Sequence, residues 1–328
     1  EARAGDSAIL TCRLIDRPLR PLFPKGVRND IQIIANVYSA DMENEPDIFG
    51  IIGASAALTI SRIPFDGPVG AVRIGRVDEQ LIVNPTVDQM EAGSLNMVVA
   101  GTADAITMVE AGALEVGEDV IVDALVMAQQ EIARIAEFQN QLREKAGVEK
   151  FAVVPAEVDE DLRSRVENQY LDSLREAMQI KAKNPRSAAL KSLKKKAAEE
   201  LSTEEADVSR QVGGFIEALE KQTARSMIAE GKRVDGRALT DIRPISCEVG
   251  ILPRTHSSAL FTRGQTQALV ITTLGTSHDE QIVDDLSLVT RRSFMLHYNF
   301  PPFSTGETRF MLSPGRREIG HGALAHRA

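Results

Sequence analysis

Residues 252–270 read LPRTHSSALFTRGQTQALV, and this stretch contains two β-strand patterns separated by a tight turn. SALFT and QALVITTLG are rich in apolar and β-branched residues, and the Arg-Gly pair at 263–264 between them is typical of a hairpin turn. We therefore predict an antiparallel hairpin. Downstream, the alternating apolar segment SFMLHYNF (293–300) predicts another strand, and a helix is expected to begin at Arg316, after a Pro-Gly pair.

The first 150 residues also mix strand and helix patterns. Period-2 apolar runs predict strands, whereas apolar residues spaced three and four apart predict helices. The expected elements are strands at 31–38 (IQIIANVY) and 95–101 (LNMVVAG), a hairpin at 71–77 and 81–85, a buried helix of small residues at 50–61, and a long helix at 118–145 lying across the sheet.

Residues 155–230 have a different composition, which is rich in Glu, Lys, Ala and Leu, and they show no strand pattern. Leu162, Val166, Tyr170 and Leu174 recur every four residues and mark one amphipathic helix; two more follow. This segment is therefore expected to form a small all-helical domain. The Lys194–Lys196 run is interpreted as a solvated helix face.

The bulk composition is that of a soluble globular protein of two or three domains, with 328 residues, 43% apolar and 26% charged. Aromatic residues make up 4%, with no Trp, which argues against a sugar-binding groove or a binding site built on stacked aromatic rings. Cys12 and Cys247 form no disulfide framework, so a reducing cytoplasm is expected. No apolar run reaches the ~20 residues that span a bilayer, so no membrane partner is expected. No signal peptide is visible, and both ends, from Glu1 without Met to Ala328, are interpreted as cut.

The net charge of −9 hides two basic islands. A polyanion responds to the local field and not to the sum over the chain, so these islands favour a nucleic-acid partner. The first, at 12–28, holds Arg13, Arg17, Arg20, Lys25 and Arg28 against Asp16; the second, at 309–327, holds Arg309, Arg316, Arg317, Arg327, His321 and His326 against Glu318.

The two islands share a short pattern. Arg13-Leu-Ile-Asp-Arg17 can be laid on Arg317-Glu-Ile-Gly-His321, with an ionisable side chain at the first and fifth positions and Ile at the third. On a helix, residues four apart share a face, so each pair could hold neighbouring phosphates of one strand. Two unrelated amphipathic helix starts would give the same short match. The order α/β, helical, α/β favours a duplicated domain instead.

Longer motifs carry a family resemblance. RLIDRPLRPLFPKG (13–26), GASAALTISRIPFDGPVGAVRIG (53–75) and LNMVVAGT (95–102) resemble the first RNase PH-like domain of the polynucleotide phosphorylase family. GKRVDGRALTDIRPI (231–245), LPRTHSSALFTRGQTQALV (252–270), LHYNFPPFSTGET (296–308) and SPGRREIGHGALAHR (313–327) resemble the second. The chain is thus similar to an internal fragment of such a protein.

The resemblance implies an α/β (α+β) fold with two partial RNase PH-like domains, of the ribosomal protein S5 domain 2-like kind, joined by a small all-helical domain. Residues 1–150 are expected to be the C-terminal part of the first, 151–230 the all-α linker domain, and 231–328 the N-terminal part of the second.

The resemblance also implies a function: 3′-to-5′ phosphorolytic degradation of mRNA to nucleoside diphosphates, reversible to polymerisation. Inorganic phosphate is the implied co-substrate and Mg²⁺ or Mn²⁺ the implied metal. The implied partners are single-stranded RNA, two further copies in a ring-shaped homotrimer, and an RNA degradosome with an endoribonuclease and a helicase. The family's serine-rich phosphate loop, metal-binding carboxylates and KH and S1 modules would follow residue 328. No metal ligand is therefore named, and the fragment itself is expected to be inactive.

By the same resemblance, Arg316 and Arg317 are assigned to the RNA and attacking phosphates, and His321 to orienting the terminal backbone. Phosphorolysis brings two phosphates together, so the site must supply fixed positive charge. The alternative is an exposed pair at a helix start, where the helix dipole disfavours cations. Gly320 and Gly322 flank His321 and are expected to allow close approach to a ligand.

Arg13, Arg17 and Arg20 match the corresponding segment of the non-catalytic first domain and are expected to contact RNA. Pro18 and Pro21 would interrupt a helix here, so these arginines are expected on a stiff turn. Arg17 could instead form a structural ion pair with an acid.

Other ionisable residues rank lower as functional candidates. His297 is expected to be a core histidine, His256 lies in an expected loop, and Asp279, Glu280, Asp284 and Asp285 are interpreted as a solvated loop, not a metal site. Two other functions stay open: a non-catalytic RNA-binding ring subunit, and a helical adaptor that binds a protein through 155–230.

Overall fold

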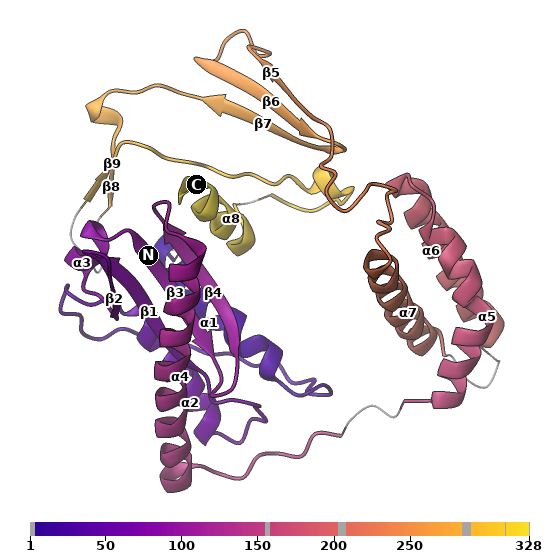
Figure 1. Cartoon of the computed structure of the whole chain (residues 1–328), viewed down its shortest axis with the longest axis horizontal. Helices are drawn as coiled ribbons and strands as arrows, with labels where there is room; N and C mark the ends of the chain where they lie inside the picture. The colour runs from indigo at the N-terminus through magenta and orange to yellow at the C-terminus, as the bar shows by residue number, and fades with distance from the viewer. Residues whose placement is uncertain (1–3, 155–157, 203–207, 284–289, 312, 328) are drawn as a thin grey trace. The chain divides into compact units, whose positions relative to one another are not determined.

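The computed structural model describes residues 4–154, 158–202, 208–283, 290–311 and 313–327 (Figure 1). The chain divides into two compact units, one made of residues 1–155 and 275–328 and the other of residues 156–274. No helix in the described ranges is long and apolar enough to cross a membrane.

A four-stranded antiparallel sheet forms the centre of the first unit. Its strands are β1 (Gly70–Val77), β2 (Gln80–Val83), β3 (Leu95–Gly101) and β4 (Ile106–Ala113), in the order β2-β1-β3-β4. β1 pairs with β2 as a hairpin, and β3 lies between β1 and β4. The predicted hairpin and the predicted strand at 95–101 are therefore confirmed.

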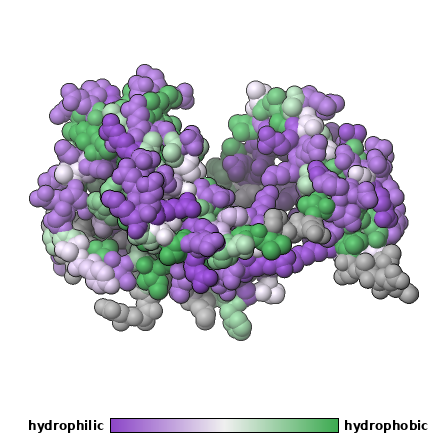
Figure 2. All heavy atoms as spheres, turned by 90° about the horizontal axis from the view of Figure 1, so that it is seen from below, coloured by the Kyte–Doolittle hydropathy of each residue, from purple (hydrophilic) through white to green (hydrophobic). Residues whose placement is uncertain are grey.

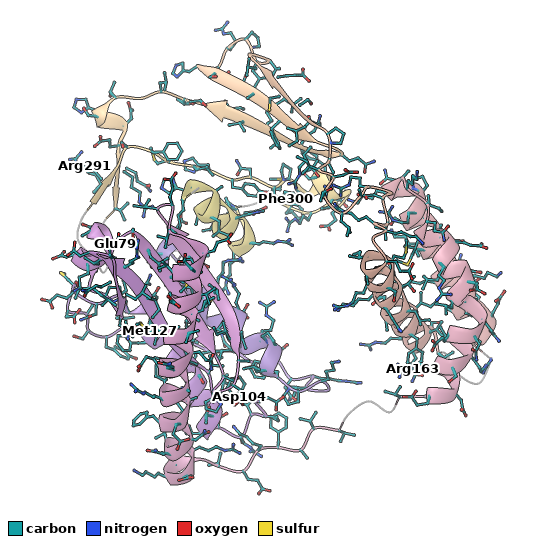
Figure 3. All side chains as sticks on the ribbon, viewed as in Figure 1. Glu79, Asp104, Met127, Arg163, Arg291 and Phe300 are labelled. Atoms are coloured by element: carbon teal, nitrogen blue, oxygen red, sulfur yellow. The ribbon has the colours of Figure 1, made fainter. Side chains whose placement is uncertain are left out.

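Helices cover both faces of this sheet. α1 (Asp6–Leu19) and α2 (Asp47–Ile60) share a core with one face, which includes Val98 and Met108. α4 (Glu118–Ala146) packs on the other face, against Val72 and Met97, and Met127 of α4 lies at the edge of this core (Figure 3). Alternate residues of a strand point to opposite faces, and the two cores follow that alternation. The buried helix and the long helix across the sheet are confirmed.

A buried ion pair ties α2 to the sheet. Arg73 of β1 and Asp47 of α2 are joined at 2.6 Å, with side chains only 10% and 13% exposed. Arg73 also donates to the side-chain oxygen of Asn96 at 2.5 Å. A buried charge needs such partners, because its desolvation costs several kcal/mol.

α1 continues through Pro18, which corrects the expectation that the arginines lie on a stiff turn. Pro18 falls in the last turn, where it removes one backbone donor but interrupts no long run of hydrogen bonds. Arg13 and Arg17 are therefore on a helix. The chain tightens only afterwards, in a short 3-10 helix, η1 (Arg20–Leu22), so Arg20 lies beyond the α-helix.

Two predicted strands are absent: residues 31–38 and 293–300 have no regular secondary structure. A strand requires a hydrogen-bonded neighbour, and neither segment pairs with a strand among the described residues. Tyr38 is 93% exposed. His297 is exposed too, so the expectation of a core histidine was wrong.

The remaining elements of the first unit are short, apart from α8 (Arg316–Arg327), which begins at the predicted residue. The others are α3 (Val87–Ala92), η2 (Ser277–Asp279), β8 (Gln281–Val283), β9 (Thr290–Arg292) and η3 (Pro302–Thr305). β8 and β9 pair antiparallel, and Arg291 of β9 (Figure 3) lies 4.0 Å from the carboxylate of Glu280.

The second unit contains three helices and a three-stranded sheet. α5 (Glu160–Met178), α6 (Lys183–Leu201) and α7 (Ser209–Ala229) bury a common core that includes Val166, Leu174 and Ile216. The all-helical prediction for this region is confirmed. Lys195 and Lys196 are exposed on α6, as expected for a solvated face, whereas Lys194 pairs with Glu217 of α7.

The sheet of the second unit has the order β5-β6-β7. β5 is Ile245–Val249, β6 is Ser257–Arg263 and β7 is Thr266–Thr272. β6 and β7 form the predicted hairpin, and Gly264 in its turn has a φ of +61°, which favours glycine. Apolar side chains such as Val249 and Leu269 remain exposed, and Figure 2 shows apolar residues among hydrophilic ones on one face of the chain.

Candidate functional site: a pair of basic helices

Part of each basic island of the sequence lies on a helix, Arg13 and Arg17 on α1 and Arg316, Arg317 and Arg327 on α8, and these helices pack against each other (Figure 1). Their contact is very close at Gly320. A Cβ atom placed on Gly320 would lie 2.7 Å from Cζ of Arg13, and no real Cβ contact is that short. The absence of a side chain at Gly320 therefore lets the Arg13 guanidinium lie against the backbone of α8. We refer to α1 and α8 together as the basic helix pair.

α8 also packs on the segment that precedes it. A Cβ on Gly322 would lie 3.2 Å from Cβ of Tyr298. The rings of Tyr298 and His321 are 4.9 Å apart, and those of Phe294 and His326 are stacked at 5.1 Å. The glycines that flank His321 thus give close approach to protein groups, and close approach of a ligand to His321 stays a prediction.

Glu110 of β4 contacts both helices of the pair. Its Oε2 lies 2.5 Å from Nη1 of Arg17 on α1, and its Oε1 lies 3.3 Å from Nη1 of Arg327 on α8. Arg17 also donates to the carbonyl of Val109 at 3.2 Å. Arg17 therefore forms an ion pair with an acid, which is Glu110; its side chain stays 37% exposed, and its contact with RNA stays a prediction.

Arg316 and Arg317 occupy the first turn of α8 and are exposed. Within the described parts of the chain, neither has an ion pair or a side-chain hydrogen bond. The neighbouring Glu318 accepts a hydrogen bond from the backbone N–H of Gly315 and lies 3.8 Å from Arg309. The one acid of this turn is therefore occupied, and the two guanidinium groups keep their full donor capacity.

Arg20 is the most exposed of the three α1-side arginines, at 75%. It pairs with Asp16, four residues earlier, and donates to both carboxylate oxygens. The structure thus brings Arg13 against α8 at Gly320 and Arg17 against Glu110 of β4, whereas Arg20 lies in the 3-10 turn beyond α1 with its own acid.

The arrangement can bind an anion. Arginine presents a planar set of donors that matches phosphate oxygens, and unpaired exposed arginines on adjoining helices can contact successive phosphates. No group of three or more His, Cys, Asp or Glu among the described residues could hold a metal ion. The residues present therefore do not fit a Mg²⁺ or Mn²⁺ site.

The contacts of Glu110 and the packing role of Gly320 were not predicted from the sequence. The sequence does contain one indication of the role of Glu110. Glu110 lies two residues after Met108 in β4, so both side chains are on the same face of the sheet, and Met108 points into the core shared with α1. A carboxylate at the inward parity of a strand requires a cationic partner.

The lower-ranked candidates are explained by local structure. Nδ1 of His256 accepts a hydrogen bond from the backbone of Leu274 at 2.8 Å. Asp279 accepts hydrogen bonds from the backbone and the hydroxyl of Thr276, which hold its pKa below the ordinary value. Asp284 and Asp285 lie outside the described residues.

The helical part of the second unit has a groove of ≈ 720 Å³ between α5, α7 and the loop that follows α7. Its cations are Arg175, Lys181, Lys232 and Arg233. Residues 161–238 carry sixteen Lys and Arg against thirteen Asp and Glu, a net charge of +3 in a chain of net charge −9. This part of the chain is therefore the more favourable one for a polyanion.

Two family models of 3′ exoribonucleases match the chain. The model of the 3′ exoribonuclease family, domain 1, matches residues 1–64 and 241–328, and that of domain 2 matches residues 67–131. The model described as polyribonucleotide nucleotidyltransferase, RNA binding domain, matches residues 161–238. The chain belongs to the polyribonucleotide nucleotidyltransferase family.

Curated relatives agree along the whole chain. It is 50% identical over 329 residues to the polyribonucleotide nucleotidyltransferase of Heliobacterium modesticaldum, covering 100% of this chain and 46% of the relative. The corresponding proteins of Geobacter sulfurreducens and Geobacillus kaustophilus are 50% and 49% identical, again over 100% of this chain and 47% and 46% of their own lengths. The chain thus spans about half the length of the relatives it matches.

Proposed function

We propose that this chain is part of a phosphate-dependent 3′-to-5′ exoribonuclease, which releases nucleoside diphosphates from RNA and can run in reverse. The observation that carries the proposal is the basic helix pair in a chain of this family. Arg316 and Arg317 are exposed and lack acidic partners among the described residues, and Arg13 lies on the adjoining helix. The family places its phosphate-handling residues in this segment.

The division of roles follows from the surroundings of each arginine. Arg316 and Arg317 bind the RNA phosphate and the attacking phosphate, because phosphoryl transfer between like charges needs fixed positive charge. His321, whose ring contacts Tyr298, orients the terminal backbone. Arg13 and Arg17 contact the strand further along, and Arg20, paired with Asp16, contributes least.

Other parts of the proposal come from the family. Residues 1–150, 151–230 and 231–328 correspond to part of the first RNase PH-like domain, the helical domain and part of the second. The whole protein acts in the cytoplasm as a ring-shaped homotrimer on single-stranded RNA, alone or in a degradosome with an endoribonuclease and a helicase. A Mg²⁺ or Mn²⁺ ion is held by carboxylates outside this chain. Residues 161–238, which match the RNA binding domain model and carry a net charge of +3, add to RNA binding.

The test compares the full-length protein with the 328-residue chain. Both are incubated with a single-stranded RNA, inorganic phosphate and Mg²⁺, and nucleoside diphosphates are measured. We expect phosphate-dependent release by the full-length protein and none by the 328-residue chain. A full-length protein that binds RNA but releases no diphosphate would contradict the enzyme and favour the non-catalytic ring subunit.

A further inference from the structure

α8 is attached to the rest of its unit with very little apolar burial. The only buried residues of this helix are Gly320 and Gly322, and Leu324 is 47% exposed. A helix usually docks through an apolar stripe of larger side chains. Ile319 and Ala323 are half-buried, so the position of α8 depends on these two side chains, on the contacts of its glycines, on ring contacts and on polar links to neighbouring elements.

The carboxylate of Glu110 in β4 forms polar links to both α1 and α8. Each of its oxygens takes one arginine, Arg17 of α1 on one side and Arg327 of α8 on the other. Its side chain is only 17% exposed, so the two ion pairs are partly shielded from water. The two arginines come from segments about as far apart in sequence as this chain allows.

We propose that Glu110 is a positioning residue, which holds α8 against α1 so that the arginines of both helices face one RNA strand. The part concerning RNA rests on the proposed function; the part concerning α8 does not. Glu110 itself contacts no RNA, because a carboxylate repels phosphate. Its role is to set the relative placement of the two helices through Arg17 and Arg327.

Charge alone predicts the opposite effect on RNA binding. A Glu110→Gln change removes one negative charge and releases two guanidinium groups, so a purely electrostatic role would give tighter binding. A positioning role gives weaker binding, because the arginines of α8 lose their fixed distance from those of α1. The sign of the change in affinity therefore separates the two explanations.

The matched control is Glu115→Gln. Glu115 follows β4, is exposed, and has no ion pair among the described residues, so this change removes the same charge close to the same strand end. Glu110→Asp keeps the charge but shortens the side chain by one methylene. We call the bridge from Arg17 through Glu110 to Arg327 the clamp. If the clamp holds α8, the amide exchange rate of α8 and the RNA affinity of Glu110→Asp should lie between those of the wild type and Glu110→Gln.

The first measurement is hydrogen–deuterium exchange of the backbone amides, followed by mass spectrometry, on the purified 328-residue chain. We expect peptides from α8 to exchange several-fold faster in Glu110→Gln, because the ion pair of Arg327 with Glu110, which links α8 to β4, is lost. Peptides from α4 and β1 should be unchanged, and so should all peptides of Glu115→Gln. Unchanged exchange in α8 of Glu110→Gln overturns the clamp, whatever the protein does with RNA.

The second measurement is fluorescence anisotropy with a labelled single-stranded RNA at several KCl concentrations. We expect Glu110→Gln to bind several-fold more weakly than the wild type, and Glu115→Gln to bind at least as tightly. Faster α8 exchange with equal or tighter RNA binding overturns the positioning role for RNA but leaves the clamp. If the wild type binds no RNA, the proposed function of the basic helix pair fails, and the exchange experiment still decides the clamp.

Discussion

The guanidinium of Arg13 lies against the backbone of α8 at Gly320, so closely that a Cβ atom at Gly320 would be 2.7 Å from Cζ of Arg13. The contact joins the two basic islands of the sequence, which are separated by some 300 residues. It also gives Gly320 a role that its flexibility does not explain, because Gly320 lies within a helix, where glycine is unfavourable. The space taken by Arg13 accounts for its presence.

A Gly320→Ala change should therefore displace the guanidinium of Arg13 from α8. This guanidinium is the end of a flexible side chain and can move aside, so we expect its lost contact to offset the gain of about 1 kcal/mol that alanine brings in helix propensity. Gly213→Ala in α7 is the matched control, since a Cβ there meets nothing within 4 Å and should stabilise α7 by about 0.5–1 kcal/mol. Amide exchange of α7 and α8 gives both local stabilities. Equal gains in local stability in α7 and α8 would show that Arg13 does not restrict the space at Gly320.

Helices and hairpins could be predicted from the sequence because their hydrogen bonds are local. The Pro-Gly pair before Arg316 and the periodic run from Glu118 each determine a helix within a few residues. Residues 31–38 and 293–300 have equally good strand patterns but no strand, since a β pattern states only that a segment would fit a sheet. A partner strand has to be supplied from elsewhere.

The features of the candidate site also fall into two groups, those predictable from local sequence and those that depend on distant contacts. The basic residues of α1 and α8 were visible as clusters, and their shared spacing predicted a relation between them. The contact between Arg13 and Gly320 and the double role of Glu110 were not visible, because spacing along a chain does not show which helix faces meet. Only the position of Glu110 on the core-facing side of β4 indicated that a cationic side chain lies nearby.

The ion pair between Asp47 and Arg73 should be much more important for stability than an exposed pair in the same sheet. Asp47→Asn leaves the buried guanidinium of Arg73 without its countercharge, and we expect a loss of about 3–5 kcal/mol in the free energy of unfolding. Glu79→Gln is the control, because Glu79 pairs with Arg76 but its side chain is 83% exposed, and its loss should cost about 0–1 kcal/mol. Urea unfolding measures both. Similar losses would mean that burial does not set the strength of the Asp47 pair.

Tyr170 should make the helical domain sensitive to alkaline pH. Burial, and then the hydrogen bond that its hydroxyl donates to Glu200 at 2.6 Å, raise the pKa of Tyr170 to about 12. The folded state thus favours the neutral phenol. The associated stability is fully present below pH ~10, the usual pKa of tyrosine, and is lost as the pH rises towards about 12, by about 2–3 kcal/mol in all.

The pH effect is measured as a difference between wild type and Tyr170→Phe. The stability advantage of the wild type in urea unfolding should shrink between pH 9 and pH 11.5, since Phe cannot ionise. Tyr38→Phe serves as the control, because Tyr38 is 93% exposed and its change should give no pH-dependent difference. An advantage of Tyr170 that stays constant across this range would mean that its phenol is not protected from ionisation.

The last prediction concerns the unequal roles of Arg317 and Arg13 in the full-length protein. Arg317 is exposed at the start of α8 and has no acidic partner among the described residues, so Arg317→Ala should leave the free energy of unfolding within about 0.5 kcal/mol of the wild type. Its loss should instead lower the turnover of RNA by about 10- to 150-fold, which corresponds to one charge-assisted phosphate contact of about 1.5–3 kcal/mol.

Arg13→Ala should mainly weaken the binding of long RNA and reduce the slope of log affinity against log salt by about 1, with little effect on turnover at saturating RNA. Arg20→Ala is the matched control, because Arg20 already pairs with Asp16 and its loss should change both quantities least. Turnover with saturating RNA and anisotropy at several salt concentrations separate the two effects. Equal losses of turnover in Arg317→Ala and Arg13→Ala would mean that α1 and α8 do not divide binding and chemistry between them.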